Sequence, residues 1–346
     1  MKAIVLHEHG DTSVLHYTDV YEPEPRHHEV LIHVRACALN HLDLWVRRGI
    51  AGYQIPFPHI PGSDIVGEVV KLGPEVSTVH IGQKVLLAPG VTCGKCPACL
   101  SGNDNRCPDA TILGFMVDGG CAEYVRCPEV NCLPYPENLD WAHAAAVPIV
   151  FQTAWHMLVN RGRLQPGETV LVIAAGSGIG SAAIQIAKFF GARVIATVGS
   201  DEKVAKAKEI GADEVIHHGI VAVAKEVRRL TDNKGVDILI EHVGAATWNE
   251  SMKSLAPGGR LVTCGCTTGY DVKLDIRFLF TRELSVLGSY MGTKDELHTV
   301  LKLVERGRLK PIVDKVWPLY DCIVGHHYLE HDKHFGKVVL TTPEQH

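Results

Sequence analysis

Four cysteines in one short segment are the clearest chemical signal in this sequence of 346 residues. Two residues separate Cys93 from Cys96 and Cys96 from Cys99, and Cys107 follows after seven more. Tetrahedral zinc takes thiolates at roughly 2.3 Å, and two-residue spacers let one tight turn present successive sulfurs to the same ion. Because four thiolates leave no position for water or substrate, we expect one structural zinc per chain in the loop 93–107. The alternative is a set of buried free thiols or a disulfide pair.

A second signal is a turn rich in small residues between an apolar strand and a helix. The strand is expected at 169–174, and the turn leads into a helix that runs from Ser181. Small residues let backbone N–H groups approach a pyrophosphate at the positive end of a helix. The strict glycine pattern is not met, because Ala175 and Ser177 stand where glycines are usual. We expect a dinucleotide site here, with simple strand–helix packing as the alternative. The expected contacts in the turn are Ser177, Gly178, Ile179 and Gly180.

The next strand, expected at 193–198, lacks the terminal acid that binds the ribose 2′-hydroxyl in most NAD-dependent enzymes. It continues into Gly199 and Ser200, the first acid is Asp201, and Lys203 lies beyond it. A hydroxyl and a cation suit a 2′-phosphate, so NADP(H) is expected to be preferred over NAD(H). Alternatively, Lys203 is an ordinary solvated helix residue.

These signals sit in a chain whose pattern changes near residue 150. Residues 1–150 contain short β-rich runs broken by Pro and Gly. Beyond them, apolar strands alternate with helical stripes, which predicts an α/β fold with a doubly wound parallel sheet. The expected strands are 169–174, 193–198, 214–217, 236–241 and 260–264, and the expected helices are 181–190, 203–210, 221–230 and 248–255. We expect Pro257, Gly258 and Gly259 to end the last of these helices.

Composition excludes several classes of partner. Lys and Arg total 34 against 39 for Asp and Glu, and no basic run appears, so nucleic acid and anionic membranes are not expected as partners. The apolar stretch 169–187 is interrupted by glycines and polar residues, which favours a strand, a turn and a helix over a membrane span. Eleven cysteines and no export signal favour a reducing, cytoplasmic compartment.

Over essentially its whole length the chain resembles the medium-chain dehydrogenase/reductase superfamily. The four-cysteine loop is similar to that of the zinc alcohol dehydrogenases, and Pro61–Asp64 with Gly67 resembles their P-G-H-E-x-x-G segment. Ala174–Gly180 and Val147–Trp155 instead resemble the quinone oxidoreductase branch. The resemblance implies a homodimer or homotetramer and a cleft for the cofactor. The implied domains are a β-rich GroES-like domain at 1–150, a Rossmann domain at 151–289, and a tail at 290–346 that returns to the first domain.

The resemblance does not extend to the catalytic zinc. Two of its ligand positions hold Asn40 and Ser63 instead of Cys and His, and the third falls near Ile149. An amide and a hydroxyl are poor zinc ligands, and isoleucine is none. Leu42 replaces the threonine of the alcohol dehydrogenases' proton relay, so alcohol chemistry by that route is not expected.

The resemblance also implies roles for individual residues. Asp43 and Asp64 would hydrogen-bond to the groups around the site without binding a metal themselves. Alternatively, His41, Asp43 and Asp64 supply three N/O ligands for a metal ion. Thr153 matches a position that bonds near the nicotinamide, unless it only caps a helix. The expected catalytic region comprises Asn40, His41, Asp43, Trp45 and Asp64, with Tyr53 as a further lining group. The other expected cofactor contacts are Ser200, Lys203, His218, Val243, Gly265 and Lys337.

Three functions remain open. The first is an NADPH-dependent reductase of quinones or of activated enones and carbonyls, in which orientation and a hydrogen bond suffice without a Lewis acid. The second is a zinc-dependent alcohol dehydrogenase with a non-standard metal site. The third is a nucleotide-binding relative that has lost turnover, because fold does not imply function.

Overall fold

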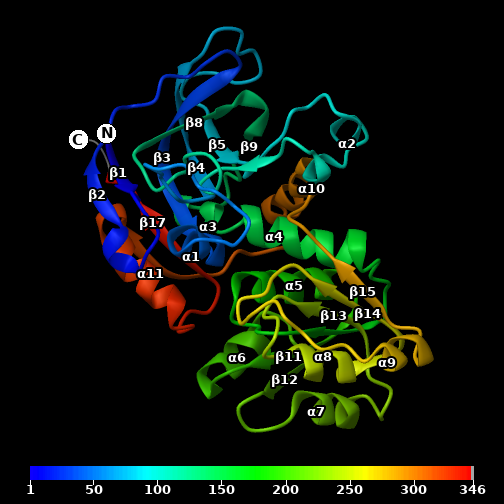
Figure 1. Ribbon diagram of the computed structural model, residues 1–346. Helices are drawn as coiled ribbons and strands as arrows, with labels where there is room; N and C mark the ends of the chain where they lie inside the picture. Colours follow the sequence, from blue (N-terminus) through cyan, green and yellow to red (C-terminus); the bar gives the residue numbers. More distant parts are fainter. Residues whose placement is uncertain (344–346) are drawn as a thin grey trace. The chain divides into compact units, whose positions relative to one another are not determined.

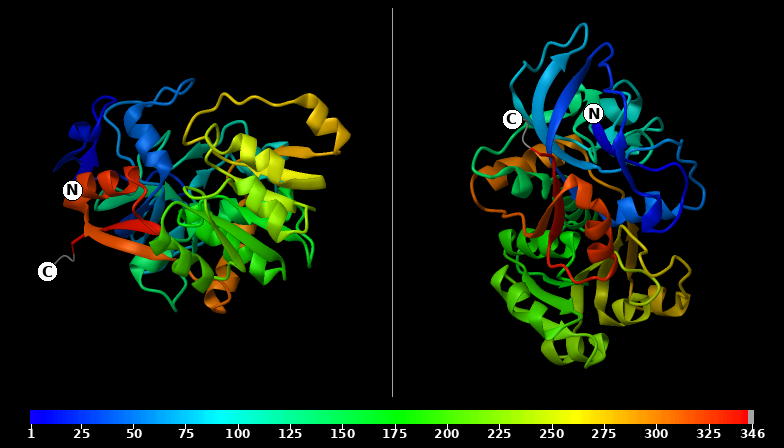
Figure 2. Two further views of the ribbon diagram at one scale, coloured as in Figure 1. Left: turned by 90° about the horizontal axis from the view of Figure 1, so that it is seen from below. Right: turned by 90° about the vertical axis from the view of Figure 1, so that its left-hand side faces the viewer.

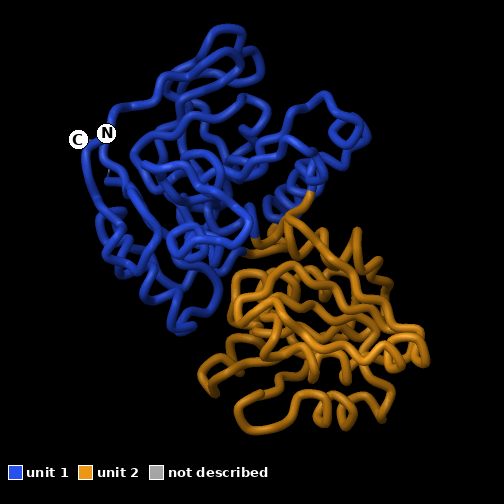
Figure 3. The backbone as a smooth tube through the Cα atoms, in the orientation of Figure 1, with its two compact units in different colours: residues 1–149, 293–306, 311–346 blue, residues 150–292, 307–310 orange. Residues whose placement is uncertain are grey.

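In the computed structural model, which describes residues 1–343, the chain folds into two compact units (Figure 3). Unit 1 contains residues 1–149, 293–306 and the residues from 311 onward, and unit 2 contains residues 150–292 and 307–310. The chain therefore leaves unit 1 near residue 150 and returns to it near residue 293.

Unit 2 is built on a parallel sheet whose strands follow the order β12, β11, β10, β13, β14, β15 (Figure 1). The strands are β10 (Thr169–Val172), β11 (Arg193–Val198), β12 (Glu214–His217), β13 (Val236–Glu241), β14 (Leu255–Thr263) and β15 (Ser285–Gly288). The helices are α5 (Gly178–Phe189), α6 (Asp201–Glu209), α7 (Val223–Leu230), α8 (Trp248–Ser254) and α9 (Ile276–Thr281). The strand order reverses direction at β10 and β13, which confirms the doubly wound sheet.

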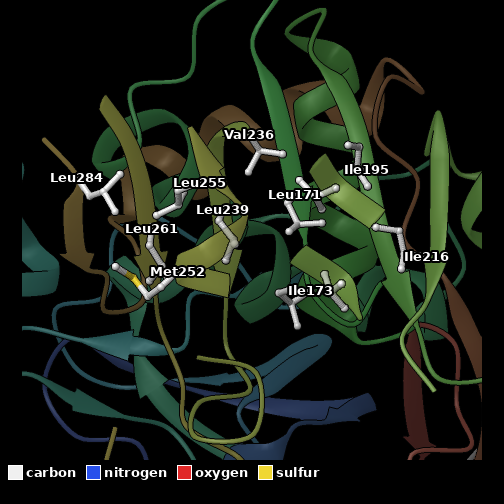
Figure 4. Close-up of a cluster of buried hydrophobic side chains, with 12 residues drawn as sticks. Leu171, Ile173, Ile195, Ile216, Val236, Leu239, Met252, Leu255, Leu261 and Leu284 are labelled. Atoms are coloured by element: carbon white, nitrogen blue, oxygen red, sulfur yellow. The ribbon is translucent and has the colours of Figure 1, made fainter. Parts of the chain in front are cut away.

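The core of unit 2 forms because its strands are apolar along most of their length. Parallel strands buried on both faces read as continuous apolar runs rather than alternating ones. Leu171, Ile195 and Leu239 from the three central strands have no exposed surface and belong to one cluster (Figure 4). Met252 of α8 packs into the same cluster, so the helix covers the sheet through its buried side. This core holds the strand ends in place, and the candidate cofactor residues follow those ends.

One expected boundary in unit 2 is wrong. Pro257–Gly259 was expected to separate a helix from a strand that begins at residue 260, but β14 already begins at Leu255 and includes these residues. The register explains the difference, because Val236 pairs with Leu255 whereas Ile238 pairs with Arg260, so the extra residues form an irregularity in the ladder. The strand β15 and the helix α9 were also not predicted from the sequence.

Unit 1 contains a largely antiparallel sheet in the order β16, β17, β3, β4, β5, β9, with β8 paired to β3. Its strands are β3 (Glu29–Leu39), β4 (Asp64–Leu72), β5 (Lys84–Leu87), β8 (Tyr124–Pro128), β9 (Cys132–Pro134), β16 (Val313–Pro318) and β17 (Lys337–Thr341). Smaller pairs are β1 (Lys2–Val5) with β2 (His16–Asp19), and β6 (Gly90–Val91) with β7 (Thr111–Ile112). The helices are α1 (His41–Arg48), α2 (Pro97–Leu100), α3 (Trp141–Ala145), α10 (Lys294–Glu305) and α11 (Cys322–Glu330), and α4 (Pro148–Trp155) leads into unit 2.

The C-terminal tail completes the sheet of unit 1. β17 pairs in parallel with β16, seen beside it in Figure 2, and antiparallel with β3, where Val338 lies opposite Leu39. This register places Lys337, at the start of β17, next to the end of β3. The apolar stretch 169–187 forms β10, a turn and most of α5, and no helix within residues 1–343 combines the length and apolarity needed to cross a membrane.

Candidate active site and cofactor site

The expected cofactor residues of unit 2 gather at one edge of its sheet. Because the strands are parallel, their carboxyl ends lie on the same side, where nucleotides bind in folds of this type. The residues that follow the ends of β10, β11, β12, β13 and β14 are, in that order, Ser177, Ser200, His218, Val243 and Gly265.

The turn after β10 has the geometry of a phosphate cradle. Ala174 adopts a positive φ of 52°, and the Oγ of Ser177 accepts a hydrogen bond from the Gly180 N–H at 2.8 Å, which caps α5. A Cβ added at Gly180 would lie 2.2 Å from the Ala174 carbonyl oxygen, so only glycine allows this approach of helix to strand. α5 therefore begins at Gly178 with its positive end at the turn, which fits a dinucleotide pyrophosphate despite the incomplete glycine pattern.

The sequence analysis did not predict His242, whose ring contacts both ends of this turn. Its buried ring places Nε2 3.0 Å from the Ile173 carbonyl oxygen and 3.3 Å from Ser177 Oγ. A carbonyl oxygen only accepts, so the ring carries its proton on Nε2, and burial lowers the pKa of His242. A histidine that directly follows a predicted strand, opposite the cofactor turn, was the available signal.

A lysine and two histidines lie where β11 and β12 end. Nε2 of His218 would lie 3.1 Å from a Cβ at Gly199, and the Lys203 N–H donates to the Ser200 carbonyl at 3.2 Å. Burial, then the charges of His217 and Lys203, lower the pKa of His218. The Asp201 side chain, the first acid after β11, points largely into solvent with 89% exposure. Lys203 and His218 thus lie close enough for their charges to interact at the ends of these strands.

Three other predicted cofactor residues, Thr153, Val243 and Gly265, lie outside the turn that follows β10. Thr153 is buried in α4, and the Val243 N–H donates to Glu241 Oε1 at 2.8 Å. A Cβ at Gly265 would lie 2.9 Å from the His242 carbonyl oxygen. Gly265 therefore allows the chain after β14 to pass close to the end of β13.

In unit 1, two of the three positions that correspond to ligands of a catalytic zinc contact one carboxylate, and the third, Ser63, directly precedes that residue in the chain. Asp64, which follows Ser63, begins β4 and is fully buried. Its Oδ1 accepts the Ile149 N–H at 2.8 Å, and its Oδ2 accepts the Asn40 amide at 3.0 Å. The side chains at these three positions are an amide, a hydroxyl and an aliphatic group, and the Ser63 hydroxyl is buried without a hydrogen-bond partner within residues 1–343. These groups do not fit a tetrahedral zinc.

Lys337 lies in this cluster with 4% exposure. Its Nζ is 2.9 Å from Asp64 Oδ2, 2.5 Å from Asn40 Oδ1 and 2.7 Å from the Leu39 carbonyl oxygen. The sequence analysis expected Lys337 to contact the cofactor, but all three ammonium hydrogens already have acceptors in this arrangement. Asn40 is equally committed, because its amide nitrogen also donates to the Ala38 carbonyl at 3.3 Å. It has no amide hydrogen left for a substrate.

Asp43 stabilises the backbone beside this cluster. Its Oδ2 accepts the Asn40 N–H at 2.7 Å and its Oδ1 accepts the Gly62 N–H at 2.9 Å, while complete burial raises the pKa of Asp43. His41 and Trp45 lie on α1, and the His41 ring is 6.4 Å from that of His334. Among residues 1–343, the alternative set of His41, Asp43 and Asp64 does not form a group close enough to share an ion.

The four cysteines do form such a group. Their sulfur atoms all lie within 4.8 Å of one another, in the loop that contains α2. Backbone N–H donation from Lys95 and Cys96 lowers the pKa of Cys93 to about 7, which favours its thiolate. The pKa of Cys96 is instead raised to about 11, because the lowering by the Cys99 N–H is outweighed by desolvation and the neighbouring sulfurs. Lys294 of α10 lies beside the loop, with its N–H 3.3 Å from Asp104 Oδ1 and its Nζ 3.2 Å from Thr92 Oγ1. The four sulfurs would hold a structural zinc.

Comparison with known proteins finds matching families for both parts of the chain. The "Alcohol dehydrogenase GroES-like domain" family matches residues 26–137, and the "Zinc-binding dehydrogenase" family matches residues 178–306. A quinone oxidoreductase of Rattus norvegicus is 30% identical over 348 residues, which cover 98% of this chain and 97% of that protein. The chain belongs to the medium-chain dehydrogenase/reductase superfamily.

Two further relatives show the range of this superfamily. An acryloyl-coenzyme A reductase of Metallosphaera sedula is 31% identical over 348 residues, which cover 99% of this chain and all of that protein. A crystal structure of an NAD-dependent alcohol dehydrogenase has a TM-score of 0.96 and 47% identity, covering 99% of this chain and all of that one. This medium-chain dehydrogenase is therefore an oxidoreductase with a GroES-like domain and a Rossmann domain.

Proposed function

We propose that this medium-chain dehydrogenase is an NADPH-dependent reductase of quinones or of activated enones and carbonyls, with a structural zinc and no catalytic zinc. The observation that carries the proposal is the cluster of Asn40, Asp64 and Lys337 at the position of the catalytic metal. Its groups are hydrogen-bonded to one another and offer no open ligand position.

The proposed acceptors are those that need no Lewis acid. A nicotinamide, when bound, supplies hydride to an electron-poor carbon, and the protein orients the pair and excludes water. An alcohol must instead lose a proton of high pKa, a step that zinc facilitates and that the donors at positions 40, 63 and 149 do not replace. The amide hydrogens of Asn40 already have acceptors, and the other predicted lining groups that carry a hydrogen-bond donor are His41, Trp45 and Tyr53.

The relatives support this class of acceptor. Quinone oxidoreductase and acryloyl-coenzyme A reductase are both named for electron-poor acceptors, a quinone and an α,β-unsaturated thioester. The structural neighbour named as an NAD-dependent alcohol dehydrogenase supports the second candidate, in which a metal activates an alcohol. That candidate requires a second ion in addition to the one held by the cysteines.

The preference for NADPH rests on the charge at the ends of β11 and β12. Lys203 and His218 are close enough for their charges to interact, and the side chain of Asp201 is mostly solvated. A 2′-phosphate would gain charge-assisted hydrogen bonds there. We further expect a homodimer or homotetramer that acts on a small molecule in the cytoplasm, without nucleic-acid or membrane partners.

Steady-state assays on zinc-replete protein test the proposal. NADPH and NADH are each offered with a benzoquinone, a simple enone, an α,β-unsaturated thioester and an aldehyde, and NADP⁺ and NAD⁺ are offered with primary and secondary alcohols. We expect turnover with the first three acceptors and little alcohol oxidation, even with added zinc. Strong alcohol turnover that a chelator abolishes without unfolding the protein would support the metal-dependent alternative. Absence of cofactor oxidation across the panel would support a non-catalytic relative.

A further inference from the structure

Two cysteines outside the zinc loop hold their sulfur atoms in contact. Cys127 lies in β8 and Cys132 begins β9, and their Sγ atoms are 3.8 Å apart. β8 pairs with β3 and β9 pairs with β5, so the contact joins two parts of the sheet of unit 1 (Figure 1). In a disulfide the sulfurs are about 2.05 Å apart, so these two must approach by about 1.8 Å for a bond to form. Rotation of either side chain about χ1 moves its sulfur by a comparable distance.

The backbone between the two cysteines is held on both sides. The Glu129 N–H donates to the His28 carbonyl at 2.8 Å, and Glu129 Oε2 accepts the Thr78 N–H at 2.8 Å. The amide nitrogen of Asn131 donates to the Ala88 carbonyl at 2.7 Å, and the Ala88 N–H donates back to the Asn131 carbonyl at 2.8 Å. These contacts keep the two thiols together, which raises their effective concentration above that in a flexible chain.

The two thiols differ in their access to solvent. Cys127 is 1% exposed, and its hydrogen bond with the Cys132 sulfur, followed by burial, raises the pKa of Cys127. Cys132 is partly exposed. A redox-sensitive pair needs one thiol that an oxidant can reach and a neighbouring thiol that resolves the adduct. The cysteines Cys37, Cys121 and Cys322 are all buried, so they lack the accessible member that this pair has.

We infer that Cys127 and Cys132 form a redox-active dithiol, which low-molecular-weight disulfides such as oxidised glutathione convert reversibly to an intramolecular disulfide. The Cys132 thiolate attacks first, displaces one glutathione thiolate and forms a mixed disulfide. The Cys127 sulfur then loses its proton and attacks the Cys132 sulfur, which releases the second glutathione thiolate. The dithiol loses two electrons to the glutathione disulfide, and its two protons pass through solvent to the two glutathione thiolates. No step uses the zinc loop, the cofactor or an acceptor.

A single peptide reports on this pair. Trypsin cleaves after Arg126 and after Arg161, and the peptide 127–161 contains no cysteines besides these two. The zinc-replete protein is equilibrated with mixtures of reduced and oxidised glutathione, blocked with N-ethylmaleimide under denaturing conditions and digested. Mass spectrometry then counts the maleimides on the peptide and distinguishes an internal disulfide from a glutathione adduct. We expect two maleimides in reducing mixtures and an internal disulfide in oxidising ones.

The same titration in concentrated urea with a chelator gives the reference for a flexible chain. The ratio of reduced to oxidised glutathione at half-oxidation yields the effective concentration of the two thiols in each state. Because the turn holds the thiols together, we expect the folded value to exceed the unfolded one by about tenfold or more.

Single substitutions test the order of attack. Cys127→Ser leaves the accessible thiol without a resolving partner, so it should accumulate a glutathione adduct on Cys132. Cys132→Ser leaves only the buried thiol, which should stay unmodified. Cys266→Ser removes an exposed cysteine outside the pair and should leave the titration of the peptide unchanged. Circular dichroism selects the variants that fold.

Two outcomes would overturn the inference. An effective concentration in the folded protein that is equal to or below the unfolded value would show that the fold opposes the bond. Equal glutathione adducts in folded Cys127→Ser and Cys132→Ser would show that the two thiols do not differ in access. The first measurement uses the unmodified chain, so it decides even where a variant does not fold.

Discussion

The two charged centres of unit 1 differ in how they are assembled. The zinc loop draws four thiols from the short segment 93–107, and three of these cysteines are partly exposed. The cluster at Asp64 draws an amide, a carboxylate and an ammonium from residues 40, 64 and 337, all of them buried. Four thiolates close together in the chain repel one another and need a bound metal ion to be stable. A carboxylate and an ammonium from distant parts of the chain neutralise each other. Unit 1 thus contains one centre whose side chains could hold a metal ion and another whose charges form an internal ion pair.

The largest effect is expected from breaking the zinc loop. Cys96→Ser removes one of four thiolates, so the chain should lose its zinc and more than about 4 kcal/mol of its unfolding free energy, as losses of structural metals can cause. Elemental analysis and denaturant unfolding measure the two effects. Cys266→Ser, at an exposed cysteine outside the loop, is the control and should change neither. Full zinc retention in Cys96→Ser would contradict the four-ligand assignment.

Breaking the internal pair should cost slightly less. Lys337→Met leaves the Asp64 carboxylate buried without its cation, which typically costs about 3 to 5 kcal/mol. Lys337→Met/Asp64→Asn removes both charges and should recover much of that loss, because the Asn40 amide can turn to face the new side chain. Urea unfolding of both single variants and the double variant gives the coupling. Additive losses would mean that the two charges are independent.

At the cofactor site of unit 2, the charge to be tested is that of Lys203, which is only partly buried. Lys203→Ala should raise the KM for NADPH about tenfold, since one charge-assisted hydrogen bond is worth roughly 1.5 to 3 kcal/mol, and should leave the KM for NADH nearly unchanged. Lys208→Ala, at an exposed lysine of the same helix, is the matched control. An equal rise with both cofactors would mean that Lys203 acts elsewhere.

The smallest effect is a pH dependence at His218. Burial and the charges of His217 and Lys203 lower the pKa of His218, so its ring is mostly neutral at pH 7 and gains charge only as the pH falls. A bound 2′-phosphate favours the charged ring, so preference for NADPH over NADH should rise as the pH falls from 8 to 6. About threefold is expected, equivalent to roughly 0.7 kcal/mol. The ratio of the two KM values across this range measures the effect. A His218→Asn variant that retains the full pH slope would rule out this histidine as its source.

The features that were predicted from the sequence are local ones. The cysteine spacing and the alternation of apolar strands with helices depend on residues near one another in the chain, which is why the metal loop and the doubly wound sheet were found. The role of Lys337 depends on β17 pairing with β3, some 300 residues away in sequence, and periodicity carries no information on such pairing. The available signal was a lysine directly before the apolar run Val338–Leu340, in a strand whose remaining side chains are mostly buried. The early start of β14 was missed because Pro257–Gly259 usually marks a turn, and only the register with β13 shows otherwise.

The position of β17 has a consequence for biosynthesis. Domains tend to fold in the order in which they leave the ribosome, and unit 2 is complete once residue 310 has been made. The Asp64 carboxylate, by contrast, receives its cation only when translation has passed Lys337, and until then β3 lacks β17 along one edge. A nascent or truncated chain that ends before this strand would therefore carry a folded Rossmann domain beside a GroES-like domain with an open strand edge. Such an edge is prone to aggregation, so the sheet of unit 1 is protected only when the last strand has been synthesised.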